Sequence, residues 1–354
     1  MKIIHTSDLH IDSPLTTHLS SDKVRERRRE LFSTFAAMID ECTRIEARIF
    51  IIAGDLFDSA RVTKSSRARA LGLIEKNSHI SFFYLPGNHE RTVLLDSGDL
   101  PENLFVFGEG WTYFSSGDLV IAGRQTTSPD MFDTLSLPKE KKNIVVLHGE
   151  LREHSDENGK IGRRDAAGRN ADYLALGHYH SYSSENIDSR CVAVYSGTPE
   201  GRGFDEAGDK GFSLISVDSL GVSHRFMRFA RRTLRVVSAD VSYASDAYSL
   251  EETVAEACEG IPSTDLVRVV LTGKHPLGAA PDTTAIKHRF EDKFYYFEVK
   301  DESRLRFSSG DYENDRSLKG EFIRLVTADE TLSDKEKEEI IDCGLSALLG
   351  EEAL

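Results

Sequence analysis

The sequence predicts an α/β protein built on a parallel sheet, and two observations lead to this fold class. Residues 49–53 are an unbroken apolar run, Ile-Phe-Ile-Ile-Ala, which is typical of a strand buried on both faces. Strand-like and helix-like segments also alternate from residue 2 to residue 85. Because parallel neighbours need a crossover connection, this alternation indicates βαβ units.

The segments of this alternation follow in order. The first strand is expected over residues 2–6, and a helix with Ser21 or Asp22 as its N-cap is expected to run to about Ala47. The apolar positions of that helix have helical spacing: Leu31, Phe35, Met38, Cys42 and Ile45. After the apolar strand, the pattern predicts a helix at about 64–77 and a strand at 80–85.

The middle of the chain is expected to be rich in strands, at 104–107, 111–114, 119–122, 143–147, 173–176, 191–195, 211–217 and 222–226. The character of the sequence then changes near Arg232, so the first domain is predicted at 1–232. A small α/β domain is predicted at 233–302. Amphipathic helical pieces predict a C-terminal helical segment at 303–354.

Size and composition fit a folded, multidomain protein. The chain has 354 residues, with 39% hydrophobic and 29% charged residues, which argues against disorder. No apolar run approaches the roughly 18 residues of a membrane span, and no leader pattern opens the chain. The four cysteines are far apart and form no metal-binding pair, so reduced thiols and a cytoplasmic location are expected.

The charge argues against a protein that coats nucleic acid with its whole surface, because the net charge is −15. A local exception is the stretch 225–235, which holds five arginines and no acidic residue. Two interpretations of this stretch stay open: a solvated edge strand with its linker, or a strip that contacts phosphates.

Several of the predicted strands are followed by Asp, Asn or His, whose side chains can bind a metal ion. They are Asp8, His10, Asp55, Asn88, His89, His148, His178 and His180. Ligands bind at the carboxyl ends of strands in open α/β sheets, so these groups are expected to meet in one pocket. Imidazole and carboxylate without thiolate suit Mn²⁺, Fe²⁺ or Zn²⁺, and the number of groups suits two ions with a bridging carboxylate.

These residues stand in five ordered motifs. They are Asp8-x-His10, Gly54-Asp55-x-x-Asp58, Gly87-Asn88-His89-Glu90, His148-Gly149 and Gly177-His178-x-His180. This order resembles the calcineurin-like metallophosphoesterases over residues 1 to about 230. The resemblance implies a four-layer α/β/β/α sandwich, with two sheets between helices. It also implies hydrolysis by a hydroxide that two divalent cations, expected to be Mn²⁺, activate.

The same resemblance implies a role for each of these residues. One metal ion would be held by Asp8, His10, Asp55 and His180, and a second by Asp55, Asn88, His148 and His178. His89 would be the acid near the leaving group, and Asp58 would orient a ligand. Taken alone, Asp58 is better explained as a helix-capping or turn residue than as a catalytic one.

Within this superfamily, the stretch from Tyr195-Ser196-Gly197-Thr198-Pro199-Glu200 to Asp209-Lys210-Gly211, together with the small α/β domain, resembles the SbcD-type DNA repair exonucleases, nearest to a YhaO-like bacterial branch. There the extra domain caps the metal cleft and helps to select DNA. Protein Ser/Thr phosphatases share the Gly-Asn-His-Glu motif, but they have Arg-Gly where this chain has Ser59-Ala60. That departure counts against a protein phosphatase.

The leading hypothesis is therefore a DNA exonuclease or endonuclease of DNA repair, with Arg163, Arg164 and Arg228 as phosphate contacts. The alternative enzyme is a small-molecule phosphodiesterase or phosphatase. A third possibility is a docking subunit with a structural metal site. The resemblance implies a coiled-coil ABC-type ATPase as partner, and a homodimer is a further expectation; no membrane partner is expected.

Overall fold

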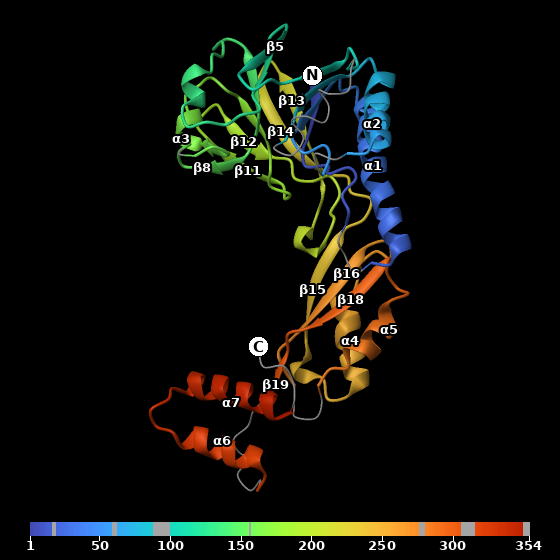
Figure 1. Cartoon of the computed structure of the whole chain (residues 1–354), viewed down its shortest axis with the longest axis vertical. Helices are drawn as coiled ribbons and strands as arrows, with labels where there is room; N and C mark the ends of the chain where they lie inside the picture. The colour runs from blue at the N-terminus through green and yellow to red at the C-terminus, as the bar shows by residue number, and fades with distance from the viewer. Residues whose placement is uncertain are drawn as a thin grey trace. The chain divides into compact units, whose positions relative to one another are not determined.

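The computed structural model describes residues 1–15, 19–58, 62–87, 100–155, 157–275, 280–305 and 316–349. The chain divides into two compact units, Met1–Leu234 and Arg235–Leu354 (Figure 1). Each unit is described by itself. The division into three parts at residues 232 and 302 stays a prediction.

Two six-stranded sheets are seen among the described residues of the first unit. The first sheet has the order β14-β13-β1-β2-β3-β4. Its strands are β1 (Lys2–Thr6), β2 (Ile49–Ala53), β3 (Ser81–Leu85), β4 (Leu104–Val106), β13 (Gly211–Asp218) and β14 (Gly221–Arg228). The strands β1 to β4 are parallel, and β13 pairs with β1 in the antiparallel direction.

The second sheet has the order β11-β12-β10-β7-β6-β5. Its strands are β5 (Thr112–Ser116), β6 (Leu119–Gly123), β7 (Lys142–His148), β10 (Tyr173–Gly177), β11 (Ser183–Asn186) and β12 (Val192–Tyr195). The four inner strands are parallel, and the edge strands β5 and β11 are antiparallel to their neighbours.

The alternation of side chains along β2 explains how the sheets stack. Ile49 and Ile51 lie in the core between the two sheets, together with Val146 and Ala175 of the second sheet. The intervening Phe50 packs with the helical layer on the other side of the first sheet. Because successive side chains of a strand point to opposite faces, one wholly apolar strand serves two cores. The expectation of a strand buried on both faces is confirmed.

The two outer layers differ in thickness. Helices α1 (Ser21–Arg44) and α2 (Lys64–Lys76) cover the first sheet and bury Phe35 and Ile74 against it (Figure 1). The outer face of the second sheet is covered by short pieces, η2 (Met131–Thr134) and α3 (Arg163–Ala166), with the loops beside them. The α/β/β/α layering holds, although its fourth layer is thin.

The second unit has its own core. A three-stranded sheet, in the order β15-β16-β18, consists of β15 (Leu234–Asp240), β16 (Leu266–Thr272) and β18 (Tyr296–Asp301). Helices α4 (Ala247–Ala257) and α5 (Thr283–Phe290) contribute to the same hydrophobic core. Helices α6 (Leu318–Ala328) and α7 (Asp334–Leu349) lie side by side and bury Ile323, Ile341 and Leu345 in a cluster of their own (Figure 1).

The elements differ from the sequence expectations at their ends. The N-cap of α1 is Ser20, whose side chain accepts from the Lys23 amide, so the prediction of Ser21 or Asp22 was wrong by one or two residues. Helix α1 ends at Arg44 instead of near Ala47. The short pairs β8 (Glu150–Arg152) with β9 (Lys160–Gly162) and β17 (Lys274–His275) with β19 (Arg304–Leu305) were not predicted, because two or three residues carry no periodicity.

All four cysteines lie in the described residues and are free thiols; three of them are buried and Cys343 is exposed. In the part of the chain that the structure describes, no helix combines the length and the apolar character that crossing a bilayer requires.

Candidate metal centre

The loops after β1 and β2 run side by side. The amide of Asp8 donates to the carbonyl of Gly54 at 3.0 Å, and the amide of His10 donates to the carbonyl of Asp55 at 3.0 Å. Asp8, His10 and Asp55 all adopt left-handed backbone conformations, with φ of 51°, 46° and 48°. Non-glycine residues rarely adopt this region, and such residues cluster at functional sites. The pairing of the loops aims these three side chains at one region.

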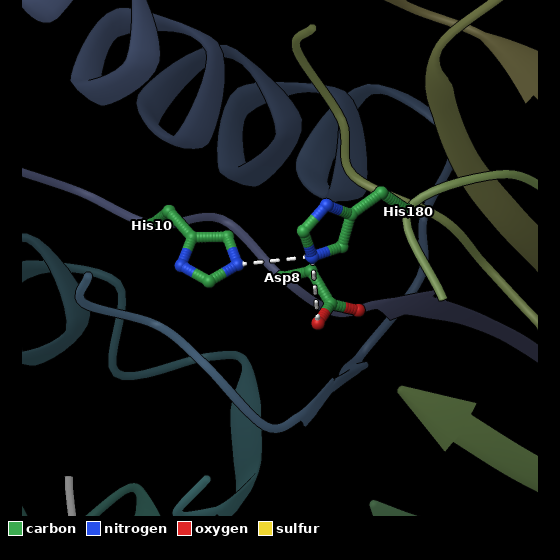
Figure 2. Close-up of side chains that lie close together, drawn as sticks. All are labelled: Asp8, His10 and His180. Carbon is green, nitrogen blue, oxygen red and sulfur yellow. Dashed lines mark hydrogen bonds and ion pairs between the residues drawn. The ribbon is translucent and has the colours of Figure 1, made fainter. Parts of the chain in front are cut away.

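The first cluster consists of Asp8, His10 and His180 (Figure 2). The Nε2 atoms of the two imidazoles face each other at 3.3 Å. Nε2 of His180 also lies 3.8 Å from Oδ1 of Asp8. Asp8 is fully buried, and its two carboxylate oxygens accept from the backbone amide of His178 at 3.2 and 3.1 Å. The side chain of Asp8 is therefore fixed from behind while it faces the histidines.

The second cluster consists of Asp8, Asp55 and His148, so Asp8 belongs to both. Nδ1 of His148 lies 2.9 Å from the carbonyl of Ala53, which can only accept. Nδ1 therefore carries the proton, and the bare Nε2 lies 3.6 Å from Oδ2 of Asp55. Oδ2 of Asp55 is also 3.9 Å from Nε2 of His10.

Two glycines make this close approach possible. A Cβ atom on Gly54, whose φ is 98°, would lie 2.0 Å from Nδ1 of His148. A Cβ atom on Gly87 would lie 1.7 Å from Oδ1 of Asp55. Both distances are far below a van der Waals contact, so only glycine allows these side chains to occupy their places.

The donor set fits divalent cations. Within the described residues no hydrogen-bond donor reaches Oδ1 of Asp55, although this oxygen is buried. A buried carboxylate oxygen without a partner is costly, because its desolvation is not compensated. The carboxylates of Asp8 and Asp55 and the imidazoles of His10, His148 and His180 are also hard or borderline ligands. A cation would satisfy groups that otherwise lack partners.

Charged neighbours surround the two facing histidines. Nδ1 of His180 lies 2.7 Å from Oε1 of Glu206, and this hydrogen bond raises the pKa of His180. Burial raises the pKa of Glu206, but hydrogen bonds from His180 and Arg202 outweigh it and lower this pKa to about 2. Nδ1 of His10 lies 3.2 Å from Oδ1 of Asp58, and this contact lowers the pKa of Asp58.

The structure thus brings five of the predicted ligands together. His178 lies beside them: its ring centroid is 5.6 Å from that of His148, and burial lowers its pKa. Asp58 contacts His10. Asn88 and His89 lie outside the described residues.

The predicted phosphate contacts belong to the first unit, and each is paired with a carboxylate that is in neither cluster. Arg163 pairs with Glu153 and Glu185, and Arg164 also pairs with Glu153. Arg228 pairs with Asp209.

The comparison with protein families identifies the first unit. The family model described as calcineurin-like phosphoesterase matches residues 1–187, more than half of the chain. The chain belongs to this family. The phosphoesterase is thus a hydrolase of phosphoesters, and its family uses a dinuclear metal site.

Two curated relatives resemble the phosphoesterase over most of its length. The Bacillus subtilis protein named uncharacterized metallophosphoesterase YhaO is 26% identical over 301 residues, which are 78% of this chain and 72% of that protein. The DNA double-strand break repair protein Mre11 of Methanosarcina mazei is 25% identical over 280 residues. That match covers 75% of this chain but only 44% of Mre11.

Solved structures also resemble the phosphoesterase. The protein TT1561 of Thermus thermophilus matches with a TM-score of 0.43 and 12% identity, over 64% of this chain and 98% of that one.

Sequence reasoning missed Arg202 and Glu206 of the phosphoesterase, which contact Asp58 and His180. They follow the Ser-Gly-Thr-Pro motif at 196–199, in the stretch that resembles the SbcD-type exonucleases, but the sequence assigns no role to its single residues. The one signal in the sequence was Glu206 itself, an acidic residue in the segment that follows the last of the predicted ligands, His180.

Proposed function

We propose that this phosphoesterase is a metal-dependent phosphodiester hydrolase that cuts DNA, as an exonuclease or an endonuclease. The observation that carries the proposal is the convergence of two buried carboxylates and three imidazoles at the strand ends, with Oδ1 of Asp55 left without a partner among the described residues. Such a set of groups suits cations that neutralise the charge of a phosphate better than it suits a purely structural role.

Two divalent cations, proposed to be Mn²⁺ with Fe²⁺ or Zn²⁺ as alternatives, would be held by the predicted ligands. Asp8, His10, Asp55 and His180 would hold one ion. Asp55 would share the second with Asn88, His148 and His178. Bound there, the cations neutralise phosphate charge and make a water molecule acidic near neutral pH.

The chain itself supplies proton transfer and alignment in this proposal. His89 would give a proton to the departing sugar oxygen, a contribution of about 10²- to 10⁴-fold in rate. Asp58 would orient His10, which its 3.2 Å contact with Nδ1 supports. The left-handed backbone at Asp8 and Asp55 holds both carboxylates in place before a substrate arrives.

DNA is favoured as substrate by the relatives. Mre11 of Methanosarcina mazei is named as a DNA double-strand break repair protein, and its match with this chain extends beyond the phosphoesterase family model. Arg164 and Arg228 have side chains that are 68% and 78% exposed, so both can exchange their carboxylate partners for phosphates. A role in DNA repair would agree with the cytoplasmic location that the free cysteines suggest.

A second candidate is a small-molecule phosphodiesterase or phosphatase. The net charge of −15 favours it, as does the pairing of Arg163, Arg164 and Arg228 with carboxylates, because neither feature attracts a polyanion.

One assay separates the two candidates. The metal-free protein is supplied with Mn²⁺ or Mg²⁺, with EDTA as the negative control. It is then tested on single- and double-stranded DNA, on bis-p-nitrophenyl phosphate and on p-nitrophenyl phosphate. We expect Mn²⁺-dependent DNA cleavage whose KM rises with salt. Cleavage of the small diester or monoester without any cleavage of DNA would favour the second candidate.

Two variants test the site in the same assay. Asp55→Asn is expected to abolish turnover of every substrate while the fold is retained. His89→Gln is expected to slow turnover while Mn²⁺ still binds. Full activity of the Asp55 variant would refute the site.

A coiled-coil ATPase of the ABC type is proposed as a partner, docking on the C-terminal helices. Helix α6 leaves Leu318 and Leu325 exposed at 71% and 65%, seven residues apart and thus near one face of the helix. Co-purification of the ATPase with the full chain, compared with a chain ending before residue 317, tests this docking. Sedimentation of the protein alone tests the proposed homodimer.

A further inference from the structure

We propose that Glu206 and Arg202 are positioning residues, which hold the imidazoles of His180 and His10 in the orientation that binds a cation. The proposal rests on the proposed function, because it concerns the same metal centre. Neither residue is among the predicted ligands, and although both lie in the stretch 195–211 that resembles the SbcD-type exonucleases, the sequence predicts no role for either.

Glu206 fixes the imidazole of His180. Its side chain is 4% exposed, and Oε1 lies 2.7 Å from Nδ1 of His180. A carboxylate can only accept, so Nδ1 of His180 carries the proton. Nε2 faces the cluster, 3.8 Å from Oδ1 of Asp8, where it can ligate a cation. A carboxylate behind a metal-binding histidine sets its tautomer and its ring orientation in this way.

Asp58 stands behind His10 in a similar place: its Oδ1 lies 3.2 Å from Nδ1 of His10, an ion-pair contact without the alignment of the Glu206 hydrogen bond. Both histidines thus have Nδ1 next to a carboxylate and Nε2 turned toward the other ring. Their Nε2 atoms are only 3.3 Å apart, so one ring can donate to the other, or both can ligate one cation (Figure 2).

Arg202 joins the two carboxylates. Its Nη1 donates to Oδ1 of Asp58 at 2.9 Å, and its Nη2 donates to Oε1 of Glu206 at 2.6 Å. Nη2 also lies 3.2 Å from Nδ1 of His180, so the guanidinium contacts the imidazole as well as Glu206. One guanidinium thus connects His10 to His180 through Asp58 and Glu206. A planar fork of donors suits this bridging, whereas a single ammonium would not.

The segment that carries Arg202 and Glu206 is itself anchored. The carbonyl of His180 accepts from Nζ of the buried Lys210 at 2.7 Å and from the amide of Thr198 at 3.2 Å. Gly197 has a φ of 71°, and a Cβ atom there would lie 2.8 Å from the amide nitrogen of Tyr182. These contacts give the Ser-Gly-Thr-Pro motif a function, because its turn brings residues 202 and 206 up to His180.

A purely structural ion pair is the rival explanation, and Arg190 provides the matched control. Arg190 donates to both oxygens of Asp172 at 3.1 and 2.9 Å and is also partly buried, but it contacts none of the proposed ligands. If Arg202 only stabilises the fold, Arg202→Gln and Arg190→Gln will have the same effects.

The test is Mn²⁺ binding to the metal-free full chain, measured by titration calorimetry, so that no turnover is needed. Arg202→Gln and Glu206→Gln are each expected to weaken Mn²⁺ binding by about 10- to 100-fold, the usual effect of losing such a supporting group. Arg190→Gln is expected to bind Mn²⁺ as the wild type does. Because both residues act through one bridge, the double variant is expected to lose less than the product of the two single losses.

Fluorescence of Trp111, the one tryptophan of the chain, monitors folding of the first unit in each variant. Folded variants with wild-type Mn²⁺ affinity would overturn the inference and leave the proposed function standing. A wild-type chain that binds no divalent cation would overturn both. Weakened binding in Arg190→Gln equal to that in Arg202→Gln would also overturn the inference, because the effect would then follow from stability alone.

Discussion

Arg27 and Glu200, 173 residues apart in the sequence, form a buried ion pair in which Nη1 donates to Oε1 at 3.0 Å. The two side chains are 3% and 1% exposed. Arg27 also pairs with Glu30, and Glu200 accepts from the hydroxyl of Thr34 at 3.0 Å. This network ties helix α1 to the segment that carries Arg202 and Glu206, so the site depends on it.

Arg27→Met is expected to destabilise the first unit by about 3–5 kcal/mol, because it leaves the buried carboxylate of Glu200 without a cation, whereas Glu30 keeps its ion pair with Arg232 at 2.9 Å. Urea unfolding followed by Trp111 fluorescence measures this loss. The control is Arg44→Met on the same helix, which removes an exposed partner of Glu41 and should change stability little. Equal effects of the two substitutions would show that burial of the network does not matter.

Gly87→Ala is expected to abolish or strongly weaken Mn²⁺ binding, because the new Cβ atom would lie 1.7 Å from Oδ1 of Asp55 and displace that carboxylate. Calorimetric titration of the metal-free protein is the measurement. Gly72→Ala is the control: it lies inside α2 with no atom within 4 Å of the new Cβ, so it should add about 0.5–1 kcal/mol of stability and leave Mn²⁺ binding intact. Undiminished binding in Gly87→Ala would mean that Asp55 is not a ligand.

The sequence predicts much of the candidate metal centre because its groups follow a local rule. Asp8 and Asp55 each lie two residues after an apolar strand, and neighbouring parallel strands end at one edge of a sheet, so their proximity can be predicted without coordinates. The carboxylates behind the proposed ligands obey no such rule. Glu206 meets His180 only through a turn at 196–199 whose path depends on Arg27, on a distant helix.

In the outer layers, too, one part could be predicted from the sequence and another could not. Helix α1 is long and periodic, and the sequence predicts it to within a few residues. The fourth layer consists of four-residue helices, which are too short to show a helical period, so no pattern marked them.

Arg164→Gln tests whether the exposed Arg164 of α3 contacts a DNA phosphate. Each phosphate contact that is lost should lower the slope of log binding constant against log salt concentration by about 0.9 on duplex DNA. Fluorescence anisotropy with a labelled duplex at several salt concentrations gives the slope. Arg190→Gln, which removes a partly buried arginine that binds Asp172, should leave it unchanged. If Arg164→Gln does not alter this slope, Arg164 is not a phosphate contact.

His5 makes the first unit sensitive to acid. Its side chain is fully buried beside the hydroxyl of Tyr173, with 2.9 Å between Nδ1 and the oxygen, and burial lowers the pKa of His5 from 6.5 to about 3. Between these two pH values the unfolded chain binds a proton that the folded chain does not. The free energy of unfolding of this unit therefore falls as the pH drops below about 6.5, and by about pH 5 the loss is on the order of 2 kcal/mol.

His5→Gln removes this titration, so its unfolding free energy should fall less between about pH 7.5 and pH 5 than that of the wild type, even if the variant is less stable at both. Urea unfolding monitored by Trp111 at the two pH values gives the difference. His288→Gln, an exposed histidine of the second unit, controls for the loss of an imidazole as such. If His5→Gln and the wild type lose the same free energy on acidification, the buried imidazole is not the group that couples folding of this unit to pH.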